Sequence, residues 1–349
     1  MKLFKSVGSF FALDIGTNAV RVVQLDTVGN NVWSLAHYGY MNIDEKLSAS
    51  DSEESKQRLG EAILTVVGQS GISTRNVVLG LPSQKTFTTV VEVPITNDSE
   101  LASLMKYQVD QHIPMSVDDA KIDWSALGPS LRDPKMQEVL ITSTAIEYTE
   151  NRLEFIEGLG FDVIAAEPDP IAMIRSLLPA NSQDAQLIVD IGEQSTNLAL
   201  VFGDAPRLVR SIPTGLSTLV KTAVQNLNVK DEQARQFILK FGLAQDRLEG
   251  QVYNALESTL DAFVSELTKS VKFFQTRYPG ISVSRILMSG YGMSIPKLSD
   301  YVSTKSGLAT IQANPWQKVQ VSQADQQKIL PVASEFATVV GLAQRDTSI

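Results

Sequence analysis

A short motif occurs twice in this chain, half a chain length apart. Residues 11–25 read as a strand, a tight turn and a returning strand, with Asp14, Ile15 and Gly16 where the first strand ends. Residues 186–201 repeat the pattern with Asp190-Ile-Gly192, and Asp190 follows Asp14 by 176 positions in a chain of 349 residues. This repeat predicts two lobes of related topology, each offering a strand-turn-strand to the cleft between them.

Mixed helix and strand patterns follow the first copy of the motif and indicate an α/β fold. The strands that we expect cover residues 32–40, 76–82, 86–93, 121–127 and 138–143. The helices that we expect cover residues 57–68, 98–112 and 149–159. Residues 77–165 together predict a compact α+β subdomain that is inserted into the first lobe.

The second half of the chain is richer in helix. We expect helices over residues 216–227, 231–241 and 252–277, followed by a strand at 285–289. The longest of them carries its apolar residues on one face, which is typical of core packing. Trp316 is expected to anchor a turn against the second lobe. The first lobe is therefore predicted at residues 1–184 and the second at 185–349, with a helical subdomain at about 228–280.

The composition excludes several kinds of site. The chain has no cysteine and only two histidines, which rules out thiol chemistry and leaves almost nothing for a histidine metal site or a Ser-His-Asp triad. The net charge is −9 and no two Lys or Arg residues are adjacent, so we do not expect nucleic acid as a partner.

Membrane insertion is also not expected. The longest apolar run, Leu198–Phe202, is far shorter than the roughly 20 residues that span a bilayer. Residues 1–14 place two lysines before a short apolar stretch that Asp14 interrupts, which does not fit a secretory signal. We expect a cytoplasmic protein, with peripheral membrane contact by residues 1–11 as a lesser alternative.

Glycine turns at the ends of central strands suit phosphate groups. A turn without a side chain lets backbone N–H groups approach phosphate oxygens closely. Carboxylates such as Asp14 and Asp190 suit a Mg²⁺ ion that keeps most of its waters. Two turns in register therefore favour polyphosphate binding.

The two motifs resemble those of known ATPases. Asp14-Ile-Gly-Thr-Asn-Ala-Val-Arg21 is similar to the first phosphate motif of the actin/hexokinase/DnaK-type superfamily, and Asp190-Ile-Gly-Glu-Gln-Ser-Thr196 is similar to the second. From about residue 8 to 345 the chain further resembles the PilM family of actin-like type IV pilus assembly proteins. The segments that carry this resemblance are 91–94, 100–101, 112–115, 289–296 with Leu298, 314–316, 335–337 and 341–345.

The resemblance implies a site for ATP and Mg²⁺ between two duplicated actin-like lobes. Asp14 and Asp190 would face the magnesium and its waters. The residues implied at the phosphates are Gly16, Thr17, Asn18, Arg21, Gly192, Gln194, Ser195 and Gly215. The residues implied at the adenosine are Glu232, Arg235, Gly290, Tyr291 and Gly292.

This sequence departs from the family pattern at the adenosine loop. Tyr291 stands between Gly290 and Gly292, where glycines are usual, and it could stack on adenine or narrow the pocket. Because side chains there would block the nucleotide, we expect Gly290→Val to abolish nucleotide binding and leave the fold intact. Glu193 lies where a water-activating group could stand, but no catalytic residue is assigned.

The resemblance implies an assembly protein with at most weak ATPase activity. A groove beside the inserted subdomain would bind the cytoplasmic N-terminal tail of a PilN-like bitopic membrane protein, so the chain would sit at the cytoplasmic face of the inner membrane. Other pilus platform or motor proteins are possible partners. Two alternatives remain: a small-molecule kinase of the same superfamily, which would need a carboxylate base beside a substrate hydroxyl, and a filament-forming cell-division or cytoskeletal protein.

Overall fold

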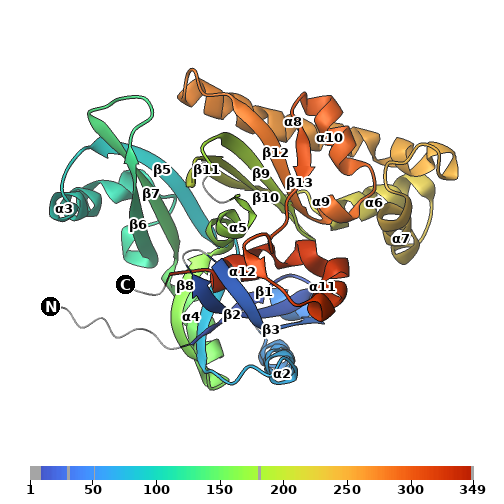
Figure 1. Cartoon of the computed structure of the whole chain (residues 1–349), viewed down its shortest axis with the longest axis horizontal. Helices are drawn as coiled ribbons and strands as arrows, with labels where there is room; N and C mark the ends of the chain where they lie inside the picture. Colours follow the sequence, from blue (N-terminus) through green and yellow to red (C-terminus); the bar gives the residue numbers. More distant parts are fainter. Residues whose placement is uncertain (1–8, 30–31, 51, 180–181, 347–349) are drawn as a thin grey trace. The chain divides into compact units, whose positions relative to one another are not determined.

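The computed structural model describes residues 9–29, 32–50, 52–179 and 182–346 (Figure 1). The chain forms two compact units, and each is described by itself. Unit 1 comprises Met1–Ala126, Val139–Ser176 and Pro315–Ile349, and unit 2 comprises Leu127–Glu138 and Leu177–Asn314.

Unit 1 is built on a six-stranded sheet in the order β14-β3-β2-β1-β4-β8. Its central strand β1 is antiparallel to β2 and parallel to β4. The strands are β1 (Phe11–Ile15), β2 (Ala19–Gly29), β3 (Val32–Asn42), β4 (Asn76–Leu81), β8 (Asp162–Pro168) and β14 (Val319–Gln320).

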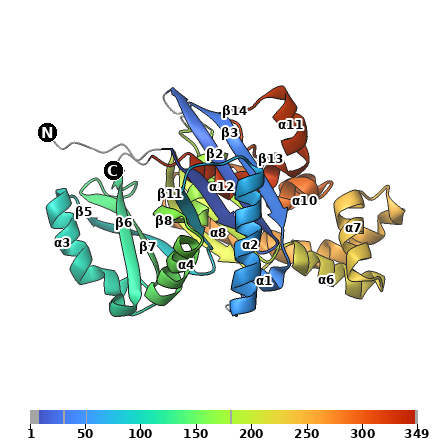
Figure 2. The same cartoon turned by 90° about the horizontal axis from the view of Figure 1, so that it is seen from below.

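Both faces of this sheet are covered, which explains why β1 is buried along its whole length and is apolar except at Asp14. Phe11 and Leu13 lie in one core with Ile63 of α2, and the intervening Ala12 lies in another core with Val339 of α12. Figure 2 shows α2 running along the sheet. The helices of unit 1 outside the inserted module are α1 (Glu45–Ala49), α2 (Glu53–Gln69), α4 (Ile146–Gly158), α5 (Asp169–Leu177), α11 (Gln323–Ile329), η4 (Leu330–Phe336) and α12 (Ala337–Ala343).

The inserted module is a three-stranded sheet in the order β5-β7-β6 with helix α3 (Figure 1). Its own core contains Val91, Leu101, Met105 and Ile141. The elements are β5 (Thr86–Pro94), α3 (Asp98–Gln108), η1 (Val109–Gln111), η2 (Val117–Asp119), β6 (Ala120–Pro129) and β7 (Met136–Ala145).

This module is narrower than the predicted range of residues 77–165. Strands β4 and β8 pair with each other in the main sheet, and Ile156 of α4 is buried in the core beneath that sheet. The apolar residues at both ends of the range therefore belong to the lobe itself.

Unit 2 repeats the topology of unit 1. Its sheet has the order β11-β10-β9-β12-β13, in which the central β9 is antiparallel to β10 and parallel to β12. The strands are β9 (Ala185–Ile191), β10 (Thr196–Phe202), β11 (Ala205–Ile212), β12 (Val283–Gly290) and β13 (Thr310–Gln312). The two Asp-Ile-Gly motifs thus mark two sheets that have the same order and direction of strands around their central strand.

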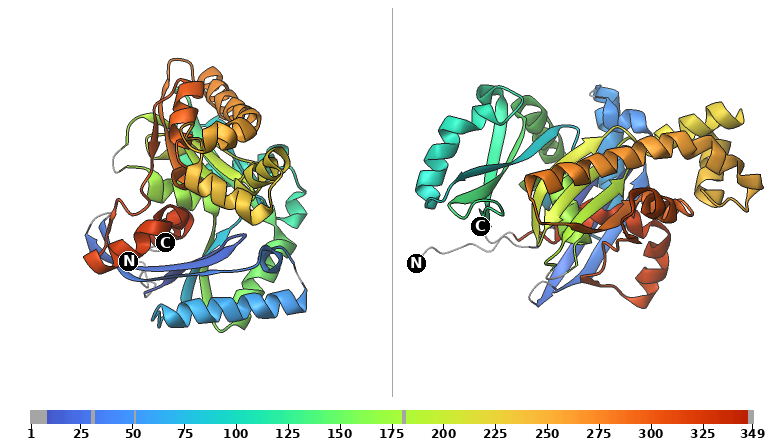
Figure 3. Two further views of the ribbon diagram at one scale, coloured as in Figure 1. Left: turned by 90° about the vertical axis from the view of Figure 1, so that its right-hand side faces the viewer. Right: turned by 90° about the horizontal axis from the view of Figure 1, so that it is seen from above.

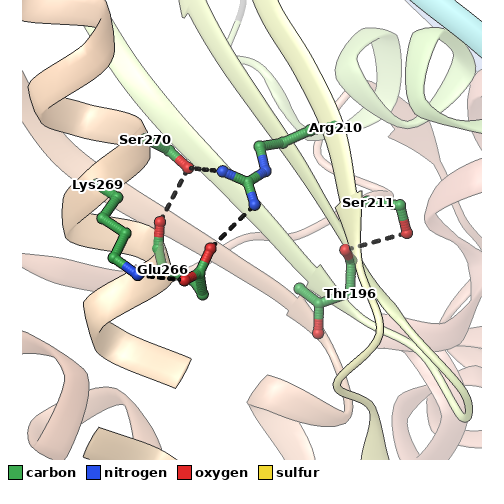
Figure 4. A network of polar contacts seen from close by, with 6 residues as sticks. All are labelled: Thr196, Arg210, Ser211, Glu266, Lys269 and Ser270. Atoms are coloured by element: carbon green, nitrogen blue, oxygen red, sulfur yellow. Dashed lines mark hydrogen bonds and ion pairs between the residues drawn. The ribbon is translucent and has the colours of Figure 1, made fainter. Parts of the chain in front are cut away.

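The longest helix of unit 2, α8, runs across this sheet (Figure 3). Its apolar stripe, which includes Leu256, Leu260 and Phe263, packs into the unit 2 core as expected. On its polar side, Glu266 accepts a hydrogen bond of 3.0 Å from Arg210 of β11 (Figure 4). The helices of unit 2 are α6 (Leu216–Leu227), α7 (Asp231–Phe241), η3 (Leu248–Gly250), α8 (Gln251–Arg277), α9 (Tyr291–Ser294) and α10 (Leu298–Ser306).

The C-terminal segment differs from the prediction. The second lobe was predicted to run to residue 349, but residues 315–349 belong to unit 1. There Phe336 and Val340 share a core with Ala12, and a Cβ on Gly341 would overlap the backbone of Ala172. Trp316 joins the same core and not the second lobe, with its ring 5.4 Å from that of Phe336.

No helix in the described part of the chain combines the length and the apolarity needed to cross a membrane. Residues 1–8, most of the segment considered for peripheral membrane contact, lie outside the described residues.

Candidate functional site

The two glycine turns have the same backbone geometry. In unit 1 the N–H of Gly16 donates to the carbonyl of Ala19 at 3.0 Å, and in unit 2 the N–H of Gly192 donates to that of Ser195 at 2.9 Å. Each turn joins the central strand of its sheet to the antiparallel neighbour. The two copies of the sequence repeat therefore form the same backbone hydrogen bond within their turns.

The first turn carries a buried ion cluster. Arg21 lies opposite Asp14 in the strand register, and its Nη1 is 3.6 Å from the Asp14 carboxylate. Its Nη2 forms a second ion pair with Glu335 of η4. Burial raises the pKa of Asp14 above its usual value, and Arg21 opposes that rise.

The backbone of the first turn is fixed by contacts with one side chain of β2 and by two hydrogen bonds from the segment that follows β3. A Cβ on Gly16 would stand 3.0 Å from Nη1 of Arg21, so the guanidinium packs against the turn. The carbonyl of Thr17 accepts from the Ser48 hydroxyl at 2.8 Å, and that of Asn18 accepts from the N–H of Ile43 at 2.9 Å. This turn is a fixed loop whose half-buried side chains are those of Thr17 and Asn18.

The second turn is attached to the start of α6. The N–H groups of Leu216 and Ser217 donate to the carbonyls of Gly192 and Glu193 at 3.0 and 2.9 Å. A Cβ on Gly215 would lie 2.5 Å from the Glu193 carbonyl oxygen, so only glycine permits this approach. The predicted phosphate residues Gly192, Gln194, Ser195 and Gly215 therefore lie together.

An ion pair also ties the second turn to α7. The guanidinium of Arg235 donates to both carboxylate oxygens of Glu193, with Nη1 3.1 Å from Oε2. This bonding is the largest cause that raises the pKa of Arg235, while burial opposes it and Tyr291 adds a smaller increase. Glu193 is thus engaged by a cation at the position considered for a water-activating group.

A cavity of about 530 Å³ lies along the same helix. Its lining includes Glu232 and Arg235, the two residues predicted to flank an adenosine, together with Gln236, Leu239 and Lys240. The cavity is wide open to solvent, and all the residues of its lining belong to α7. The fit of an adenosine here remains a prediction.

The fold of unit 2 itself requires glycine at positions 290 and 292, whether or not a nucleotide binds. Gly290 has φ +61°, and a Cβ there would overlap the carbonyl oxygen of Ile191 on the neighbouring strand. A Cβ on Gly292 would overlap the side chain of Met288. We therefore revise the expectation that Gly290→Val leaves the fold intact. Tyr291 between them packs partly against the unit 2 core.

The carboxylates fit a hydrated magnesium ion better than a protein cage. Asp14 is the fourth residue of β1, and Asp190 stands in the equivalent place on β9. Among the described residues, no three His, Asp or Glu side chains gather as a metal cluster. Mg²⁺ commonly binds through one or two carboxylates together with phosphates and waters, so a single aspartate at a turn has suitable chemistry, and the magnesium site stays a prediction.

Sequence reasoning gave no role to Glu335, nor did it pair Glu193 with Arg235. Glu335 had been noted only as part of a segment that resembles the PilM family. The Arg21–Glu335 and Glu193–Arg235 pairs join residues that are far apart in the sequence, so no local spacing of residues predicts them. The one local signal is a charged residue in the otherwise uncharged stretch Leu330–Phe336.

Solved structures with the same architecture define the class of protein. One, described as the "PilM-PilN type IV pilus biogenesis complex", has a TM-score of 0.81 at 22% identity and covers 97% of this chain and 98% of the other. The ethanolamine utilization protein EutJ from Carboxydothermus hydrogenoformans has a TM-score of 0.55 at 14% identity, covering 97% and 90%. MreB5 of Spiroplasma citri bound to AMPPNP has a TM-score of 0.50 at 12% identity, covering 95% and 94%. The chain thus has the actin-like ATPase fold, as predicted.

The family is shown by the sequence itself. The family model "Type IV pilus assembly protein PilM" matches residues 12–347, which is nearly the whole chain. This protein belongs to the PilM family of type IV pilus assembly proteins.

Proposed function

We infer that this chain is an ATP-binding assembly protein of a type IV pilus platform or a related secretion or competence system, and that it captures the cytoplasmic tail of a PilN-like membrane protein. The observation that carries the proposal is the family match over residues 12–347. The conserved bond of the two glycine turns and the fold shared with a PilM–PilN complex support it.

The nucleotide would be held by both lobes. Backbone groups of the Gly16 and Gly192 turns would receive the phosphates, while Asp14 and Asp190 would face a magnesium ion and its waters. The cavity along α7, whose wall includes Glu232, would receive the adenosine. Magnesium would supply the positive charge that a triphosphate needs, since both arginines near the turns already bind carboxylates.

The inserted module would bind the tail of the partner. β5 and β6 are the outer strands of its three-stranded sheet, and an extended peptide can add to such an edge by backbone hydrogen bonds. The tail would belong to a protein anchored in the inner membrane. The chain would therefore be cytoplasmic and peripheral to that membrane through its partner.

Calorimetric titration with ATP tests the nucleotide part. Asp190→Asn keeps the size of the side chain and removes its charge, so we expect Mg-ATP affinity to fall at least about tenfold, or ~1.4 kcal/mol. The matched control is Asp204→Asn, an exposed aspartate of the same unit, which should leave affinity unchanged. Equal affinity of wild type and Asp190→Asn would reject the magnesium assignment.

Titration with a synthetic tail peptide, followed by hydrogen exchange, tests the partner part. Binding should slow exchange in residues 86–145, and Mg-ATP should change the peptide affinity if it shifts the population of binding-competent states. Absence of peptide binding both with and without Mg-ATP would overturn the proposal. Protection confined to residues 177–314 would refute the role given to the inserted module.

A further inference from the structure

The ion pair between Glu193 and Arg235 joins two parts of the proposed site. Glu193 belongs to the turn between β9 and β10, and Arg235 lies on α7, where it also lines the cavity. The Glu193 side chain is only 5% exposed and that of Arg235 is 34% exposed. The pair is a two-pronged fork, a geometry that fixes both side chains at once.

The charge of Glu193 poses a problem for phosphate binding. A nearly buried carboxylate in a turn that receives phosphates would repel them, and such like-charge contacts cost several kcal/mol. Arg235 cancels that charge at the carboxylate itself. The guanidinium of Arg235 is cationic throughout the physiological range.

The family resemblance implies a direct contact between Arg235 and adenosine, but the main partner of this side chain is Glu193, and its interaction with Tyr291 is weaker. Both terminal nitrogens of the guanidinium are engaged by the two oxygens of Glu193. The backbone of Glu193 is in turn bonded to Ser217 of α6. The second turn is therefore held between two helices, and Arg235 supplies the link to α7.

We propose that Arg235 is a positioning residue that acts on nucleotide binding through Glu193. The pair forms a neutral brace that fixes the second turn and removes a charge that would repel the polyphosphate. This inference rests on the proposed nucleotide site and gives two of its residues a role different from adenosine contact or water activation.

The first test measures Mg-ATP and adenosine affinity in Arg235→Met, Glu193→Met and the double variant. Arg235→Met leaves the carboxylate uncompensated, so ATP affinity should fall at least about tenfold, whereas adenosine affinity should change less than about threefold. The double variant removes both charges and should return ATP affinity to within about threefold of wild type. Failure of this rescue, in a folded double variant, would show that charge compensation is not the role of the pair and would overturn the proposal.

The second test does not depend on nucleotide. In urea unfolding followed by circular dichroism, Arg235→Met should lower the midpoint clearly, because it leaves Glu193 buried without its cation. The double variant should recover most of that loss. If wild type binds neither ATP nor adenosine, the proposed function fails while this recovery still supports the brace. Equal midpoints for wild type and Arg235→Met would reject the brace itself.

Discussion

A buried ion pair in unit 2 permits a quantitative test of the packing. Glu138, at the start of β7, is fully buried and pairs with Arg207 of β11, whose side chain is also buried. The hydroxyl of Tyr278, just after α8, donates to the same carboxylate at 2.5 Å. The carboxylate therefore has both a cation and a neutral donor.

Removal of one charge should cost far more than removal of both. Breaking a buried pair typically costs about 3–5 kcal/mol, because one charge stays buried without a partner. We expect this loss for Glu138→Met and for Arg207→Met. The double variant keeps only the stranded Tyr278 hydroxyl, which costs about 1–3 kcal/mol, and adding Tyr278→Phe should bring stability near that of wild type.

Urea unfolding separates these outcomes. With a slope of about 2 kcal/mol per molar, each single variant should shift the midpoint by roughly 2 M. All three tryptophans, at positions 33, 124 and 316, belong to unit 1, so circular dichroism is needed to follow unit 2. The control is Arg285→Met, which removes an exposed ion pair to Asp184 and should cost less than about 1 kcal/mol. If the stability losses of Glu138→Met and Arg207→Met add up in the double variant, an uncompensated buried charge is not the cause of the loss in each single variant.

Four further predictions follow from the two turns and the buried groups. Gly290→Ala should destabilise the protein by several kcal/mol, whereas Gly280→Ala, which has φ +91° and open space around it, should cost only about 1 kcal/mol in the same unfolding assay. Asp14→Asn should leave stability at pH 7 unchanged or higher, since the raised pKa makes the ionised form costly, yet weaken Mg-ATP binding about tenfold by calorimetry. Burial raises the pKa of Tyr278, so unfolding stability should fall as pH rises above about 10, where the unfolded tyrosine ionises first, and Tyr278→Phe should reduce that slope. Removing magnesium with a chelator should lower ATP affinity at least about tenfold, and unchanged affinity would contradict a magnesium-borne phosphate site.

Much of the fold could be predicted because its signals are local. The helices at 216–227 and 231–241 were predicted with the observed bounds, since apolar spacing and flanking turn residues mark both ends. The two strand-turn-strand motifs were predicted for the same reason. The duplicated strand order followed from a repeat that sequence alone displays.

The features that the sequence did not predict, which are the position of the C-terminal segment and the limits of the inserted module, depend on tertiary packing. Residues 315–349 follow the second lobe in sequence, but their apolar face, with Val339 and Val340, completes the core against β1 of unit 1. The limits of the inserted module were misjudged because β4 is as apolar as the strands of the module. A run of apolar residues predicts a buried strand, but it does not indicate which sheet that strand joins.

The charges around the two turns also explain why composition alone misleads about phosphate binding. The sequence suggests that Arg21 is available to phosphates, but the structure pairs it with Asp14 and Glu335. Arg235 is similarly paired with Glu193. Because each arginine is already paired with carboxylate, the two side chains add little net positive charge at the turns. A polyphosphate bound at either turn would therefore need its own cation, and this is the reason for proposing a magnesium ion that faces the aspartate at the end of the central strand, and not an arginine, as the positive charge beside the phosphates.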